Sequence, residues 1–223
     1  MTRLRIALLT GALALAAAVF VPGALACARG YSYAGLYSPS RASGIAATIS
    51  MLGSPTVADD SSHVAGWVGV GGPGLGPHGA DEWLQVGLAT FGDSGEGRLY
   101  YELAQPGQPV RYTELATGIQ PRQKVRVALL ELPFSPDRWI VVSPAGFAGP
   151  FYLPRSHGAW EPIATAESYV QTAQCNRNAY RFDDLQLARA DGSWRAMRQA
   201  STLRDPGWRL RRHGLSGFSA TAA

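Results

Sequence analysis

Three polar side chains that could take part in chemistry, Gln85, Glu102 and Glu167, lie in segments where small or apolar residues occupy alternate positions. Because successive side chains of a β-strand point to opposite faces, each of the three is expected on the face away from that apolar row. The aromatic residues predicted on the same faces are Trp67, Trp83, Tyr100 and Tyr169. If these faces belong to one sheet, they form a wet, aromatic-lined groove that contains two carboxyls and an amide, and such a groove could bind a ligand.

Two short motifs suggest other chemistry but lack the context that each requires. Residues 92–95, Gly-Asp-Ser-Gly, copy the nucleophile segment of trypsin-like serine proteases, yet His63 is not in that family's histidine motif, so a hairpin loop is the better interpretation. Residues 69–74 match the dinucleotide-binding spelling, but no predicted helix follows them. We expect no metal site and no cofactor, because metal-ligand spacing is missing among the four histidines, His63, His78, His157 and His213.

The elements that must position these side chains are predicted to be β-strands. After residue 26 no segment shows sustained 3.6-residue apolar periodicity, whereas period-two segments recur between clusters of Gly, Pro and Asp. The predicted strands are residues 43–52, 64–71, 82–91, 98–104, 110–116, 124–132, 138–143, 163–171 and 178–188, with possible closing strands at 208–212 and 215–221. Short connections favour antiparallel pairing, and this many strands favours an all-β, two-sheet sandwich over a small closed barrel.

Residues 1–26 have the features of a secretory signal peptide. Arg3 and Arg5 form a positive start, and the apolar run over residues 6–20 is too short and too Ala-rich for a comfortable membrane span. The small-x-small pattern of residues 24–26 predicts a mature chain that starts at Cys27, with cleavage after Ala28 as the rival. We therefore expect a secreted or extracytoplasmic protein with no integral membrane span after signal removal.

Cys27 and Cys175 are the only two cysteines of the chain. An exported protein is in a disulfide-permissive compartment, so the leading interpretation is a bridge between Cys27 and Cys175 that ties the N-terminus to a late strand. A lipid anchor on Cys27 is an alternative, although Ala24 in place of leucine makes a poor lipobox. Cleavage after Ala28 would instead remove Cys27.

About 197 residues remain after the signal peptide, which is enough for one β-sandwich domain, predicted at residues 27–189. Residues 190–223 are predicted to form a basic C-terminal extension that could supply closing strands. Without Arg3 and Arg5 the chain has 18 basic and 16 acidic side chains, and from Arg189 onward seven arginines stand against two aspartates. This excess could suit an anionic cell-wall polymer or belong to a solvated tail, while nucleic acid is not expected as a partner. We expect a monomer.

Four segments resemble, in their order and rough spacing, landmarks of the glutamic peptidases, or eqolisins. They are Trp67 to Gly72 (WVGVGG), Leu84 to Gly87 (LQVG), Tyr100 to Glu102 (YYE) and Ala166 to Val170 (AESYV). The resemblance covers about residues 33–187 and implies a concanavalin-like sandwich of two antiparallel sheets. Three positions depart from the family: Gly71 replaces a common Asp, Ser168-Tyr169 replaces Trp-Ile, and Gln171 replaces a second Glu.

The resemblance also implies a catalytic dyad of one Gln and one Glu, which map to Gln85 and Glu167. In such a dyad an ionised Glu takes a proton from the attacking water and passes it to the departing amine, while the Gln amide stabilises the oxyanion. This chemistry suits acidic pH, a polypeptide substrate and no cofactor. The residues expected to line or brace the substrate site are Trp67, Trp83, Tyr100, Glu102 and Tyr169.

A non-catalytic binding module is the alternative function, because the same sandwich architecture serves lectins and carbohydrate-binding domains. In that case the aromatic side chains of the groove could stack on the sugar rings of a cell-wall glycan, or the groove could hold a peptide without cleaving it. A purely structural role at the cell surface, with neither activity, is a third hypothesis.

Overall fold

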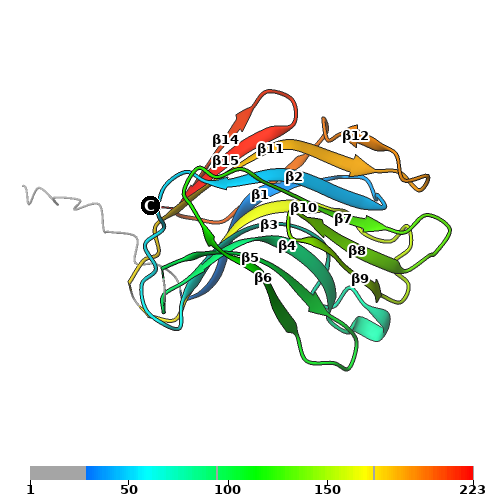
Figure 1. Cartoon of the computed structure of the whole chain (residues 1–223), viewed down its shortest axis with the longest axis horizontal. Coiled ribbons are helices and arrows are strands. Elements are labelled where there is room, and N and C mark those ends of the chain that lie inside the picture. The colour runs from blue at the N-terminus through cyan, green and yellow to red at the C-terminus, as the bar shows by residue number, and fades with distance from the viewer. Residues whose placement is uncertain (1–28, 94, 173, 223) are drawn as a thin grey trace, which may run out of the picture.

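The computed structural model describes residues 29–93, 95–172 and 174–222, so the predicted signal peptide and Cys27 lie outside the described residues. The described chain is almost entirely β, with one 3-10 turn at Pro77–Gly79. Two antiparallel sheets stack face to face, as Figure 1 shows, and the predicted all-β sandwich is confirmed. Within this part of the chain no helix has the length and apolar character needed to cross a membrane.

The first sheet has seven strands in the order β13-β1-β10-β3-β4-β5-β6. Its strands are β1 (Gly30–Tyr37), β3 (His63–Gly72), β4 (Glu82–Phe91), β5 (Gly97–Ala104), β6 (Arg111–Ile119), β10 (Ile163–Val170) and β13 (Ser201–Arg204). This order inserts β10, which comes late in the chain, between two early strands. As a result the strand of Glu167 lies beside the strand of Trp67.

The second sheet has eight strands, seven of them in the order β14-β15-β11-β2-β7-β8-β9, with β12 paired to β11. Its strands are β2 (Gly44–Met51), β7 (Val125–Glu131), β8 (Arg138–Ser143), β9 (Gly146–Tyr152), β11 (Asn178–Ala188), β12 (Trp194–Ala196), β14 (Trp208–His213) and β15 (Gly217–Ala222). Residues 190–223 thus contribute strands to both sheets, because β13 pairs with β1 while β14 and β15 continue from β11.

The hydrophobic core lies between the two sheets and is formed by the apolar row of each strand. In β4 this row contains Leu84, Val86 and Leu88, all fully buried. Tyr180 of the second sheet lies so close to Gly66 of β3 that a Cβ there would be 2.5 Å from the Tyr180 ring. Burial of this apolar row fixes which face of the first sheet points outward.

Candidate active site

The strand register places the predicted site residues together on the outer face of the first sheet. Directly opposed residues of antiparallel strands share a face. Gln85 is opposed to Gly69 of β3 and Glu167 to Ala65, and both of these β3 residues are two positions from Trp67. The same register brings to this outer face the other predicted residues, Trp83, Tyr100, Glu102 and Tyr169.

Glu167 is 6% exposed, and its carboxyl group has a hydrogen-bond partner on each oxygen. Trp67 Nε1–H donates to Oε2 over 2.9 Å, and His63 Nε2 is 3.0 Å from Oε1. An ionised carboxylate can only accept hydrogen bonds, so His63 carries a proton on Nε2 when Glu167 is ionised. Each oxygen keeps a further lone pair, so the group is held in place and can still accept a proton.

Two glycines make room for the Trp67 indole that holds Glu167. A Cβ at Gly87 would lie 2.6 Å from the Trp67 Cβ, and one at Gly69 would lie 2.7 Å from the far ring of the indole. The indole therefore extends from the Glu167 carboxyl towards Gly69, which is next to Gln85. Glycine at these two positions lets the large side chain lie flat against the sheet.

Gln85 is 8% exposed, and its Nε2 donates to the Tyr100 hydroxyl over 3.1 Å. Burial first, and then the negative charge of Glu167, raises the pKa of Tyr100 well above its ordinary value, so this hydroxyl stays neutral. Within the described residues no hydrogen bond joins Gln85 to Glu167, because the two side chains are two strands apart and the Trp67 indole lies between them. A substrate that contacts both would cross this indole.

Glu102, the second carboxyl of the face, is in a different environment. Trp83 Nε1–H donates to its Oε1 over 2.9 Å. Burial is the largest cause that raises the pKa of Glu102, and the charge of Glu167 acts in the same direction, although the Trp83 hydrogen bond opposes both. Glu102 therefore keeps its proton to higher pH than an ordinary glutamate does.

The sequence prediction missed Tyr31 and Tyr33 of β1 as neighbours of Glu167 and also missed His63 as a site residue. Tyr169 stacks on the His63 imidazole, with ring centroids 5.2 Å apart. β1 brings Tyr33 opposite Glu167 and Tyr31 opposite Tyr169. The alternate tyrosines of β1 are a period-two signal that could have identified this strand. His63 is four residues before Trp67, and this even spacing places it on the same face.

The face continues towards a groove of about 670 Å³ beside the β5–β6 loop. Tyr112 of β6 lines this groove and also stacks on Tyr100, with ring centroids 4.9 Å apart. The other groove residues are mostly polar, aromatic or proline: Leu103, Gln105, Pro106, Gln108, Pro109, Val110, Arg111, Tyr152 and Pro154. A chain bound across the outer face could extend into it.

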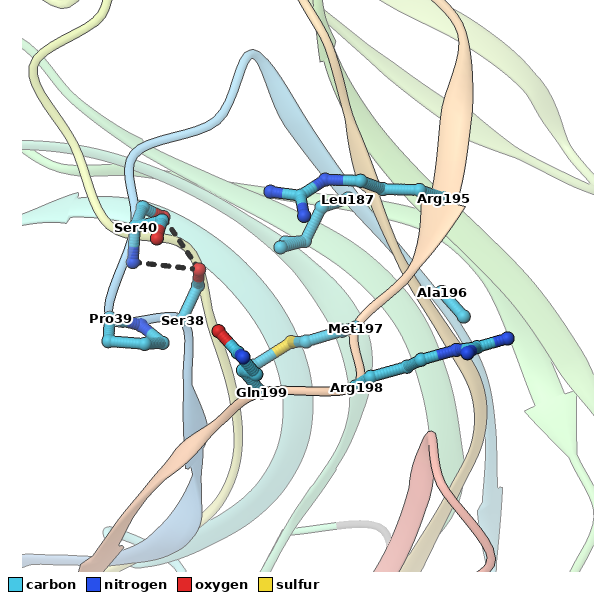
Figure 2. A pocket seen from close by; sticks show the side chains of 9 residues that line it. All are labelled: Ser38, Pro39, Ser40, Leu187, Arg195, Ala196, Met197, Arg198 and Gln199. Carbon is cyan, nitrogen blue, oxygen red and sulfur yellow. Dashed lines mark hydrogen bonds between the residues drawn. The ribbon is translucent and has the colours of Figure 1, made fainter.

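A separate pocket of about 410 Å³ lies away from this face, between the segment after β1 and the segment that includes β12 (Figure 2). Figure 2 shows the Arg195 side chain extending past Leu187 towards Ser40, whereas the Arg198 side chain extends away from Ser40. Neither Gln85 nor Glu167 lines this pocket. It is therefore not part of the candidate active site.

Cys175 follows β10 in the chain, and Gly30 lies opposite Val170 at the end of that strand. The start of the described chain is thus close in space to the segment that carries Cys175. Because Cys27 lies outside the described residues, the Cys27–Cys175 disulfide stays a prediction. No group of three or more His, Cys, Asp or Glu side chains that could hold a metal ion occurs among the described residues.

No model of a known protein family matches the sequence, and no curated protein does. Similar solved structures include scytalido-glutamic peptidase with a transition-state analogue inhibitor, at a TM-score of 0.58 and 12% identity, covering 87% of this chain and 98% of that one. Another is SCP-B, of the eqolisin family of peptidases, in complex with the tripeptide Ala-Ile-His. Its TM-score is 0.53 at 14% identity, again covering 87% of this chain and 98% of that one.

The backbone explains one departure from the family pattern. Gly71, at the position where the family commonly has Asp, adopts a φ of +80°, and a Cβ there would lie 2.2 Å from the backbone oxygen of Glu82. An aspartate does not fit this conformation, so the backbone at the end of β3 requires a glycine at position 71. The structural matches confirm the resemblance at the level of the fold: this chain has a glutamic-peptidase-like fold that is distant in sequence from the two solved peptidases.

Proposed function

We propose that this protein is a secreted endopeptidase that hydrolyses peptide bonds in acid with Glu167 and Gln85 as its dyad. The observation that carries the proposal is the nearly buried Glu167 carboxyl, held on both oxygens by His63 and Trp67 on the same sheet face as Gln85. A general base must be fixed in orientation and still have a free lone pair. Glu167 meets both conditions.

The proposed reaction needs only these two side chains and a water molecule. Glu167 accepts a proton from the water as the water oxygen bonds to the carbonyl carbon of the substrate. Negative charge develops on the carbonyl oxygen, to which the Gln85 amide donates a hydrogen bond. Glu167 then returns the proton to the amide nitrogen as the C–N bond breaks, which releases an amine and a carboxylic acid and restores the carboxylate.

The other residues of the face support binding of an extended polypeptide. Trp67, Trp83 and Tyr169 offer aromatic surface, and the groove next to Tyr112 offers space for further residues of the substrate. The raised pKa of Glu102 keeps that carboxyl neutral over more of the acid range, so it does not add a second negative charge beside Glu167.

Secretion is supported by the sequence of residues 1–26, and the two glutamic peptidases with the same fold support a polypeptide as the substrate class. Acid action is supported by the chemistry of the dyad. The same carboxyl group must be ionised to act as a base and protonated to act as an acid, and glutamate side chains in general change between these two forms at about pH 4.

Cleavage of an unfolded protein substrate by the purified mature chain, followed from pH 2 to 8, tests the proposal. We expect activity at roughly pH 3 to 5. Glu167→Gln keeps the side-chain size but removes the base, so turnover should disappear, and Gln85→Ala should lose on the order of 10²- to 10³-fold in rate. Glu161→Gln, which changes an exposed glutamate, is the matched control and should cleave like wild type. Full activity of Glu167→Gln would rule out this mechanism.

An inactive wild type at every pH would favour the non-catalytic binding module. An exposed ring on the face supports this second candidate, because Tyr31 is 57% exposed and its ring is 4.6 Å from that of the partly buried Tyr169. Two adjacent rings of this kind can stack on sugars. Retention of the protein on a cell-wall glycan, lost in Tyr31→Ala, would support that function.

A further inference from the structure

His63 contacts the Glu167 carboxyl but takes no part in the proton transfers of the proposed dyad. It is the first residue of β3, where it is opposed to Tyr169 of β10 and to Phe91 of β4. Its Nε2 lies 3.0 Å from Glu167 Oε1, and its side chain is 21% exposed. The contact joins residues 104 positions apart in the chain, so folding of the sheet creates it.

Three aromatic rings from three different strands surround the imidazole. Tyr169 stacks on it at 5.2 Å between centroids, Phe91 lies at 5.4 Å, and Tyr31 approaches edge-on at 6.0 Å. Rings in this arrangement limit the rotation of the imidazole. Packing therefore fixes the direction of Nε2 as well as its distance to the carboxyl.

The titratable groups that face this imidazole are mainly acidic. β10 contributes Glu167 and the Tyr169 hydroxyl, and β1 contributes Tyr31. β5 contributes Glu102, which interacts with His63 only when its carboxyl is ionised, and Arg98, which lies 5.2 Å from the centre of the Phe91 ring. On β4 the neighbour is Phe91 itself, which carries no charge, and Tyr112 of β6 packs behind it.

We propose that His63 is the positioning residue of Glu167: it holds Oε1 through Nε2–H and, when protonated in acid, keeps the carboxylate ionised as a base. This inference rests on the proposed peptidase function and extends it. Trp67 supplies a neutral donor to Oε2, whereas His63 supplies a donor whose charge depends on pH. An opposite charge at hydrogen-bond distance favours the ionised carboxyl and extends the working range of the base to lower pH.

Two substitutions separate the hydrogen bond of His63 from its charge. His63→Gln retains a donor but cannot become charged, so we expect its rate to be within a few-fold of wild type at pH 6. At pH 3 it should be at least about tenfold below wild type, because the acid limb moves up by about one pH unit or more. His63→Phe keeps a ring for packing but has no donor, so kcat should fall about 10-fold or more across the whole pH range while KM changes little.

The control is His157→Gln, which removes another His–Glu contact, between His157 Nδ1 and Glu131 Oε1 at 2.9 Å, outside the candidate active site. Its pH–rate profile should coincide with that of wild type. If His63→Gln and His63→Phe also coincide with wild type, His63 only fills space and the inference is overturned. Circular dichroism of each variant shows whether it folds, and His63→Gln still decides the question if His63→Phe does not fold.

A second measurement does not depend on activity. NMR titration of the His63 imidazole should show that it binds its proton more weakly in Glu167→Gln than in wild type, since the partner charge is gone. An unchanged titration midpoint would refute the pairing in solution. Absence of cleavage by wild type would refute the proposed peptidase, and with it the role of His63 in catalysis, whereas the NMR midpoint would still decide whether the two groups interact.

Discussion

Replacing Glu82 by glutamine should make the stability of this protein less dependent on pH. Glu82 is 0% exposed at the start of β4, and neither of its carboxyl oxygens has a hydrogen-bond partner among the described residues. The loop before it packs closely, since a Cβ on Gly76 would be 3.1 Å from Glu82 Oε2. Burial, with a smaller effect from the charge of Asp137, raises the pKa of Glu82 from 4.5 to about 7.

The direction of the effect follows from proton binding. Between pH 4.5 and about 7 the folded chain holds the Glu82 proton, while the unfolded chain has released it. The free energy of unfolding therefore falls as the pH rises through this window and levels off above it. A difference of about 2.5 pH units corresponds to a loss of about 3 kcal/mol. This is a large fraction of the 5 to 15 kcal/mol typical of a domain.

Urea denaturation at intervals from pH 4 to 8 measures this loss directly. Glu82→Gln cannot ionise, so the difference in unfolding free energy between variant and wild type should grow in favour of the variant as the pH rises from 4.5 to 7.5. Subtracting the unfolding free energy of wild type from that of the variant at each pH cancels the contribution of the other titrating groups, which the two proteins share. Glu161→Gln, at an exposed position, is the control and should leave the slope unchanged. Parallel curves for wild type and Glu82→Gln would refute the account of Glu82.

Two further predictions concern the dyad and the N-terminus. Tyr100→Phe removes the acceptor of the Gln85 amide, so it should cost about 1 to 3 kcal/mol of unfolding free energy and lower kcat more than it raises KM. Tyr101→Phe, on the opposite face, is the comparison, and equal kinetics for both variants would contradict this role. Peptide mapping of secreted protein without reductant should find a chain that starts at Cys27 and a bridge from Cys27 to Cys175. Reducing that bridge should cost about 2 to 5 kcal/mol, and a free thiol at Cys175 in the secreted protein would contradict the bridge.

Local alternation in the sequence was enough to predict much of the fold. Residues 82–91, 138–143 and 178–188 are predicted as strands and form β4, β8 and β11 with the same bounds. β9 was missed, because glycines and Pro150 at a sheet edge weaken the alternating pattern. β1 was also missed, although Tyr31 and Tyr33 alternate, because small residues, Gly35 among them, weaken the pattern and the strand follows closely after the predicted signal peptide.

The sequence by itself determined which face each polar side chain occupies, because the pleat of a strand gives side chains a period of two that needs no partner. This is why Gln85 and Glu167 could be assigned to faces away from the core. The partner of each group was decided by tertiary structure alone. Insertion of β10 between β1 and β3 brings His63 to Glu167 and places Tyr31 beside both. Strand order depends on contacts between distant parts of the chain, and local periodicity carries no information about them.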